Sequence, residues 1–214
     1  MRILIQPKYR RLYSTLIVFI LTLLLCACSD ETPRIPPLPP DAIVLAFGDS
    51  LTRGTGAARE HSYPAQLERL IKRRVINAGV PGELSAQGRE RLPRVLEKYK
   101  PALLILCHGG NDLMRRINKS ETRENLAAMI KQAKNHGVPV ILIGVPLPAV
   151  MFLEAAPLYD ETASEFALPY EGSILPEIEA DNALKSDRIH PNAEGYRLIA
   201  EAVNRLMVGS GALP

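Results

Sequence analysis

The chain has 214 residues, a length that suits one compact domain and is short for two. Hydrophobic residues make up 47% of it and charged residues 23%, a balance that is typical of a globular protein with a core and excludes a disordered chain. The formal net charge is only +3 at pH 7, and no basic stripe suggests nucleic acid as a partner.

Residues 1–27 have the pattern of a bacterial secretion signal. Four basic residues precede the apolar stretch Leu16–Ala27, which only Thr22 interrupts. The stretch is too short for a transmembrane helix, which needs roughly 20 apolar residues, but it matches the h-region of a secretory signal. Removal of residues 1–27, which contain no acidic residue, leaves 22 basic and 23 acidic residues, so the mature chain is nearly neutral.

The end of this segment, Leu25-Cys26-Ala27-Cys28, resembles a bacterial lipobox. By this resemblance Cys28 is the lipidated first residue of a mature lipoprotein. The protein is then anchored to a membrane of the cell envelope and faces the periplasm or the extracellular surface. An ordinary cleaved signal and an uncleaved anchor are the alternatives. Cys107 is then left without a disulfide partner, and its position in an apolar run predicts a small buried side chain.

Residues 28–40 are expected to form an extended tether, because five of the twelve residues from 29 to 40 are proline. The domain is predicted over residues 41–208, followed by a frayed tail at 209–214. Within it, short apolar runs alternate with amphipathic segments. In chain order we expect a strand at 43–47, a helix at 63–74, a strand at 75–76, a helix at 85–99 that Pro93 kinks or delays, a strand at 102–107, a helix at 120–135, a strand at 138–143, a helix near 158–166, a strand near 168–170 and a helix at 193–207.

This alternation is typical of βαβ units, which assemble into a parallel sheet with helices on both faces. We therefore predict a three-layer α/β/α sandwich around a mostly parallel sheet of about five strands, joined by right-handed crossovers. In such sheets the functional site lies beyond the carboxyl ends of the strands. Functional residues are therefore expected directly after strands.

Polar or glycine-rich segments follow the first three predicted strands, and a fourth segment precedes the last helix. They are residues 48–51, 77–82, 109–112 and 187–192. Serine hydrolysis needs a nucleophile, a base that takes its proton and a carboxylate that orients the base. Ser50, His190 and Asp187 are the candidates for these roles. The backbone N–H groups of Ser50 and Gly82 and the amide of Asn111 are the candidate oxyanion hole.

The same residues also have ordinary structural interpretations. Ser50 could cap a helix, Asp187 could lie in a surface turn, and Asn111 could bridge two loops. Asp49 and Asp112 are expected to brace their own turns. The other histidines have no patterned acid or cysteine partners, so we predict neither a metal site nor a cofactor. They are His61, His108 and His136.

The four segments resemble, in order and spacing, the motif blocks of the SGNH or GDSL hydrolase family. Phe47–Leu51 resembles the block of the nucleophilic serine, and Asn77–Gly82 the block whose last glycine supplies an oxyanion N–H. Gly109–Asp112 resembles the block with the asparagine donor, and Asp187–His190 resembles the Asp-x-x-His block. The resemblance covers residues from about 42 to 206 and implies a flavodoxin-like SGNH fold with the triad and oxyanion hole named above.

The resemblance is closest to the bacterial thioesterase I/lysophospholipase and arylesterase subgroup. It implies a serine esterase that forms an acyl-enzyme on Ser50 and hydrolyses acyl, aryl or lysophospholipid esters or thioesters. We expect the protein to be a monomer. A carbohydrate O-acetylesterase of the envelope and a non-catalytic envelope lipoprotein are the alternatives. An α/β-hydrolase is disfavoured because Thr52 stands where the Gly-x-Ser-x-Gly elbow has its second glycine.

The chain departs from the family in three places. Glu83-Leu84 follows Gly82 where relatives often have Asp-Thr, and His108 stands where relatives often carry another residue. Residues 146–186, which shape the acyl pocket in relatives, match poorly. The apolar side chains from 146 to 170 nevertheless favour longer acyl chains.

Overall fold

The structure is a computed structural model that describes residues 32–147 and 154–214. Five strands of this part of the chain form one sheet in the order β2-β1-β3-β4-β5, and every neighbouring pair is parallel. The predicted α/β fold is therefore confirmed. The strands are β1 (Ile43–Gly48), β2 (Arg74–Gly79), β3 (Leu103–Cys107), β4 (Val140–Ile143) and β5 (Tyr170–Glu171).

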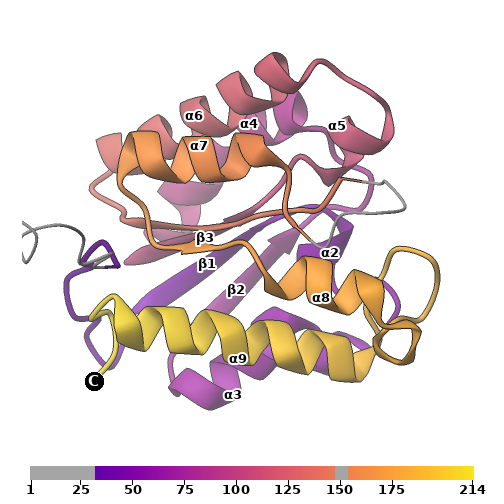
Figure 1. Ribbon diagram of the computed structural model, residues 1–214. Coiled ribbons are helices and arrows are strands. Elements are labelled where there is room, and N and C mark those ends of the chain that lie inside the picture. The colour runs from indigo at the N-terminus through magenta and orange to yellow at the C-terminus, as the bar shows by residue number, and fades with distance from the viewer. Residues whose placement is uncertain (1–31, 148–153) are drawn as a thin grey trace, which may run out of the picture. The chain divides into compact units, whose positions relative to one another are not determined.

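Helices cover both faces of the sheet (Figure 1), which confirms the three layers. One face carries α4 (Ser85–Tyr99), α6 (Lys119–Asn135) and α7 (Pro157–Phe166), and the other carries α3 (Tyr63–Ile71) and α9 (Ala193–Gly209). Short elements that the periodicity did not predict lie in the connections. They are α2 (Ser50–Arg53), α5 (Gly110–Met114), α8 (Ile174–Ala180), η1 (Arg59–His61) and η2 (Asn182–Leu184).

The three inner strands are continuous apolar runs because helices cover them on both faces. All residues of β3 and β4 are buried, as are all residues of β1 after its first. Full burial of each Leu, Ile or Phe contributes roughly 1.5–3 kcal/mol. The edge strands β2 and β5 are only partly covered. Polar residues are therefore tolerated in β2, and the strand extends over Arg74–Gly79, beyond the two apolar residues 75–76 that predicted it.

Pro93 neither delays nor interrupts α4, which runs without a break from Ser85 to Tyr99. A proline in a helix leaves the carbonyl four residues before it without its N–H partner. Here that carbonyl belongs to Arg89, and it accepts a hydrogen bond of 3.2 Å from the Gln132 side chain on α6. The neighbouring helix thus supplies the donor that the proline lacks.

Two segments that the sequence assigned to a tether and a frayed tail pack into the domain. Ile35 and Leu38 are buried, and their backbone N–H groups donate to the carbonyls of Ser210 and Ala212 at 2.9 Å. Arg73 also donates to the Leu38 carbonyl. The tail prediction for 209–214 is therefore wrong, and the folded part begins before residue 41. Apolar anchors spaced among the prolines hold the segment in place.

Two predictions concern the part of the chain outside the described ranges. The signal segment 1–27 and Cys28 both lie there, as do residues 148–153 of the poorly matched region. Within 32–147 and 154–214, no helix combines the length and apolar character needed to cross a membrane.

We predict that Ile35→Ala and Leu38→Ala each destabilise the full-length chain by about 2–4 kcal/mol, because each removes a buried apolar side chain. Pro37→Ala, at an exposed position in the same segment, is the control and should stay within about 0.5 kcal/mol of the wild type. Urea denaturation of the detergent-solubilised protein measures the difference. Equal stability of all four proteins would mean that the segment does not contribute to the core.

Candidate active site

Ser50 lies at the sharp turn that joins β1 to α2. Gly48 ends the strand so close to β3 that a Cβ at this position would lie 1.9 Å from the Cys107 carbonyl oxygen. Asp49 then caps α2, since its side chain accepts a 3.0 Å hydrogen bond from the Leu51 N–H. Ser50 is therefore the first residue of the helix and not its cap, so its hydroxyl is free for other contacts.

His190 and Asp187 lie on one tight turn before α9. Lys185 and Pro191 pair across its base, and one oxygen of the Asp187 carboxylate accepts the backbone N–H groups of Ile189 and His190, each at 2.8 Å. The second carboxylate oxygen lies 2.8 Å from His190 Nδ1. Asp187 thus holds both the backbone and the imidazole of His190.

The fold brings this turn against Ser50. His190 Nε2 lies 3.0 Å from Ser50 Oγ, although the two residues are 140 positions apart. Because Nδ1 faces a carboxylate, it carries the ring proton, and Nε2 is left to accept the serine hydroxyl proton. This relay of Asp187, His190 and Ser50 can raise the nucleophilicity of a serine.

Hydrogen bonds keep Asp187 ionised. Those from the His190 backbone and imidazole and from the Ile189 N–H lower the pKa of its carboxyl to about 2, although half of the side chain is exposed. Asp187 is therefore a carboxylate at neutral pH.

The three predicted oxyanion donors follow the carboxyl ends of the neighbouring strands β1, β2 and β3. The Ser50 N–H, at the first position of α2, has no partner within its own helix. Gly82 has a φ of +77°, a backbone conformation that favours glycine. Asn111 lies on α5, and its side-chain nitrogen is 3.3 Å from Asp49 Oδ2 and 3.1 Å from the Glu83 carbonyl oxygen.

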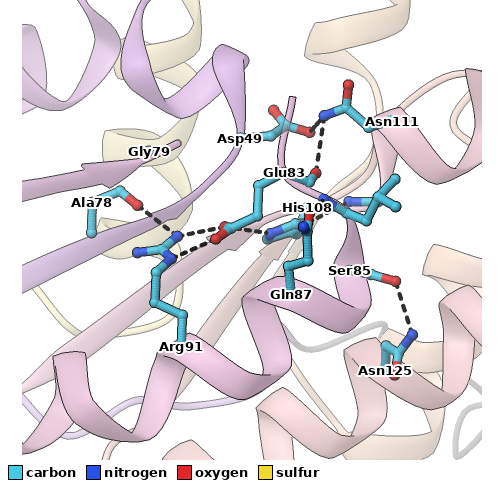
Figure 2. A network of polar contacts seen from close by, with 12 residues as sticks. Asp49, Ala78, Gly79, Glu83, Ser85, Gln87, Arg91, His108, Asn111 and Asn125 are labelled. Carbon is cyan, nitrogen blue, oxygen red and sulfur yellow. Dashed lines mark hydrogen bonds and ion pairs between the residues drawn. The ribbon is translucent and has the colours of Figure 1, made fainter. Parts of the chain in front are cut away.

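Asn111 therefore does bridge two loops, as its structural interpretation proposed. Its amide links the turn of the serine to the loop that follows β2, and Figure 2 shows both contacts. The contact to Asp49 is the longer of the two. An oxyanion bound beside Ser50 could replace that contact while the Glu83 carbonyl keeps the amide in place.

Of the two aspartates next to the candidate site, Asp49 braces its own turn, as predicted. The prediction for Asp112 is wrong, because its side chain holds the start of α4 and not its own turn. Burial raises the pKa of the Asp49 carboxyl, which accepts the Leu51 N–H and faces Asn111. Asp112 accepts the backbone N–H of Ser85 at 2.9 Å and its hydroxyl at 2.5 Å. Because Ser85 begins α4, the Asp112 carboxylate neutralises the positive end of that helix from a different loop.

Sequence reasoning missed a cluster of polar residues, two of them buried, behind the candidate oxyanion hole. Glu83, Arg91 and His108 form a hydrogen-bonded cluster there (Figure 2). The available signals were the two departures from the family at positions 83 and 108. Nothing in the sequence indicated that they face each other.

Cys107 is buried at the end of β3, as predicted, and burial raises the pKa of its thiol well above the ordinary value. In the described ranges, no group of three or more His, Cys, Asp or Glu side chains is arranged to hold a metal ion. The expectation of chemistry without a metal or cofactor stays a prediction.

Comparison with known proteins gives a consistent result. Residues 46–198 match the GDSL-like Lipase/Acylhydrolase family. The chain is 30% identical over 165 residues to "Thioesterase 1/protease 1/lysophospholipase L1" of Escherichia coli K12, a match that covers 74% of this chain and 79% of that protein. It is 36% identical over 110 residues to "Esterase TesA" of Pseudomonas aeruginosa, where the match spans 49% of this chain and only 55% of the relative.

The fold agrees with solved structures. The crystal structure of TesA superimposes with a TM-score of 0.69 at 26% identity and covers 77% of this chain and 97% of that one. The family match spans most of the domain and includes Ser50, Gly82, Asn111, Asp187 and His190. The chain therefore belongs to the GDSL-like lipase/acylhydrolase, or SGNH, family.

Proposed function

We propose that this protein is a serine esterase that hydrolyses carboxylic esters through an acyl-enzyme on Ser50. The observation that carries the proposal is the hydrogen-bonded series from Asp187 to His190 to Ser50, with contacts of 2.8 and 3.0 Å. The position of the series supports it further, since Ser50 lies two residues past the carboxyl end of the inner strand β1, where parallel sheets place their sites.

In the proposed reaction, Ser50 Oγ attacks the ester carbonyl while His190 Nε2 takes the hydroxyl proton. The carbonyl oxygen becomes an oxyanion that the N–H groups of Ser50 and Gly82 and the amide of Asn111 stabilise. His190 then gives the proton to the leaving alkoxide, and the carbonyl is restored as a Ser50 ester. A water molecule, deprotonated by His190, attacks that ester; the bond to Ser50 Oγ then breaks, His190 returns the proton to Oγ, and the acid is released.

For the substrate we propose esters with an apolar acyl or aryl group, including lysophospholipids, and the corresponding thioesters. Three segments that carry candidate site residues each also have an exposed apolar side chain close by in sequence, namely Val80, Met114 and Ile189. Val80 precedes Gly82, Met114 follows Asn111, and Ile189 precedes His190. Such side chains favour an apolar group over a sugar. The names of the relatives include thioesterase, lysophospholipase and esterase activities of those proteins.

We also propose that the mature protein is a monomeric lipoprotein of the cell envelope that begins at Cys28. The support is the basic segment, the short apolar stretch and the Cys28 motif of the sequence. Cys28→Ser should abolish incorporation of radiolabelled palmitate when the full-length chain is expressed in a Gram-negative host, and Cys26→Ser should not. Palmitate labelling of the Cys28→Ser chain would contradict the anchor and leave the esterase proposal untouched.

We expect Ser50→Ala to lower kcat for p-nitrophenyl butyrate by roughly 10⁴- to 10⁶-fold, since it removes the nucleophile. Ser164→Ala, at an exposed position on α7, is the matched control and should keep full activity. Fluorophosphonate should label the wild type and the control at Ser50, but not Ser50→Ala. Unchanged hydrolysis by Ser50→Ala would end the esterase assignment. If the wild type hydrolyses only acetyl esters, the O-acetylesterase alternative is favoured. If it hydrolyses no ester at all, the alternative of a non-catalytic lipoprotein is favoured.

We expect Asp187→Asn to lower kcat by roughly 10⁴-fold, because an amide cannot hold His190 in the tautomer that accepts the Ser50 proton. The exposed Asp160→Asn on α7 is the matched control and should stay active. Because the pKa of Asp187 is about 2, this carboxyl stays ionised at every pH above about 3. If the wild type loses activity as the pH falls toward 4, protonation of Asp187 should therefore not be the cause. Steady-state rates from pH 4 to pH 9 measure both effects. Full activity of Asp187→Asn would remove Asp187 from the mechanism.

A further inference from the structure

A carboxylate is buried directly behind the candidate oxyanion hole. Glu83 follows Gly82 in the loop after β2, and only 7% of the residue is exposed. A buried charge is costly unless it is paired and hydrogen-bonded. Burial opposes ionisation of Glu83, but hydrogen bonds from His108 and Arg91 outweigh it and lower the pKa of the carboxyl. The chain thus maintains a charged group whose hydrogen bonds go to Arg91 and His108 and not to Ser50 or His190.

Arg91 holds this carboxylate with a two-pronged contact. Its Nε and Nη2 donate to the two oxygens of Glu83, each at 2.6 Å. Nη2 also donates to the Ala78 carbonyl in β2, and the guanidinium lies 4.0 Å from the centre of the Phe47 ring in β1. Arg91 thereby fixes Glu83 relative to the two strands that lead to Ser50 and Gly82.

His108 joins the carboxylate to the next loop. Its side chain is fully buried, and its Nδ1 accepts the backbone N–H of Gly109 at 2.9 Å. The neutral ring then carries its hydrogen on Nε2, which donates to Glu83 at 3.1 Å. Gly88 on α4 leaves the space for this ring, since a Cβ there would lie 2.4 Å from Nε2.

Glu83 is thus tied to the loop of Asn111 at two points. Its carboxylate reaches Gly109 through His108, and its backbone carbonyl accepts the Asn111 amide at 3.1 Å (Figure 2). The backbone carbonyl orients the Asn111 amide, and the side chain of the same residue, held by Arg91, fixes where that carbonyl lies. Orientation of an oxyanion donor matters because a misplacement of about 1 Å can cost 10²-fold in rate.

We propose that Glu83, clamped by Arg91 and His108, is a positioning residue that fixes the Asn111 amide for the developing oxyanion. The inference rests on the proposed function, because Asn111 matters in this way only if an oxyanion forms. Glu83 itself does not touch the substrate in this mechanism. Its effect therefore falls on the transition state and not on substrate binding.

The test compares Glu83→Ala with the conservative Glu83→Asp in the detergent-solubilised full-length protein. Glu83→Ala keeps the backbone carbonyl but frees it from the clamp, so kcat for p-nitrophenyl butyrate should fall roughly 10- to 100-fold while KM changes less than about threefold. Glu83→Asp keeps the charge for Arg91 and should recover most of the loss. A loss that appears in KM alone, or no recovery by Asp, would overturn the proposal.

Combination with Asn111→Ala separates positioning from general support of the fold. If the clamp acts through the Asn111 amide, Glu83→Ala should cost less than about fivefold in kcat once that amide is absent. Losses that multiply would overturn the proposal. If Glu83→Ala does not fold, Arg91→Lys is tested in its place, since lysine offers Glu83 a single point charge instead of the two-pronged contact. Arg91→Lys should lower kcat less than Glu83→Ala, and this loss should become smaller when Asn111→Ala is also present.

Leu92→Ala is the control for reduced stability, since Leu92 is the fully buried neighbour of Arg91 on α4. It should lower the melting temperature yet keep kcat within about twofold of the wild type. A kcat loss equal to that of Glu83→Ala would overturn the proposal, because general loosening would then explain both. Failure of the esterase proposal gives a different result. In that case fluorophosphonate would not label Ser50 in the wild type or in any variant at position 83.

Discussion

Burial of β1, β3 and β4 on both faces is the constraint on which the rest of the structure depends. An apolar run covered from both sides leaves no room for polar side chains until the strand ends. Because the strands are parallel, their carboxyl ends meet at one edge, and the polar residues that follow them are collected there. The close approach of Gly48 to Cys107 brings the turn of Ser50 against the end of β3, within reach of Asn111.

The other half of the candidate site comes from the turn that precedes α9, the last helix, which packs beside α3 on one face of the sheet. Asn192 caps α9, and the Tyr196 hydroxyl donates to the Thr55 carbonyl at 2.7 Å. These contacts join the loop after Ser50 to the turn of His190. Within the short turn, the Asp187 carboxylate accepts hydrogen bonds from the backbone and from the imidazole of His190 and so aims the ring.

Behind the donors, the chain buries charge instead of apolar groups. Apolar residues of similar size often stabilise a protein as much as a buried ion pair does, so stability alone does not account for Glu83 and Arg91. A two-pronged contact does offer fixed geometry, which an apolar contact lacks. The same holds for Asp112, whose carboxylate joins the Asn111 helix to the start of α4. Hydrogen-bonded carboxylates thus hold both loops of the candidate oxyanion hole.

The sequence by itself determined the layer architecture, the order of the strands and long helices along the chain and the residues of the candidate triad, because these follow from local periodicity and from polar residues after strands or before the last helix. Tertiary structure decided what depends on contacts between distant residues. Ile35 and Leu38 are part of the core only because the end of the chain returns to pair with them. His108 had no patterned partner in the sequence, since Glu83 meets it across two loops and 25 positions of chain. Periodicity within one segment carries no information about such pairs.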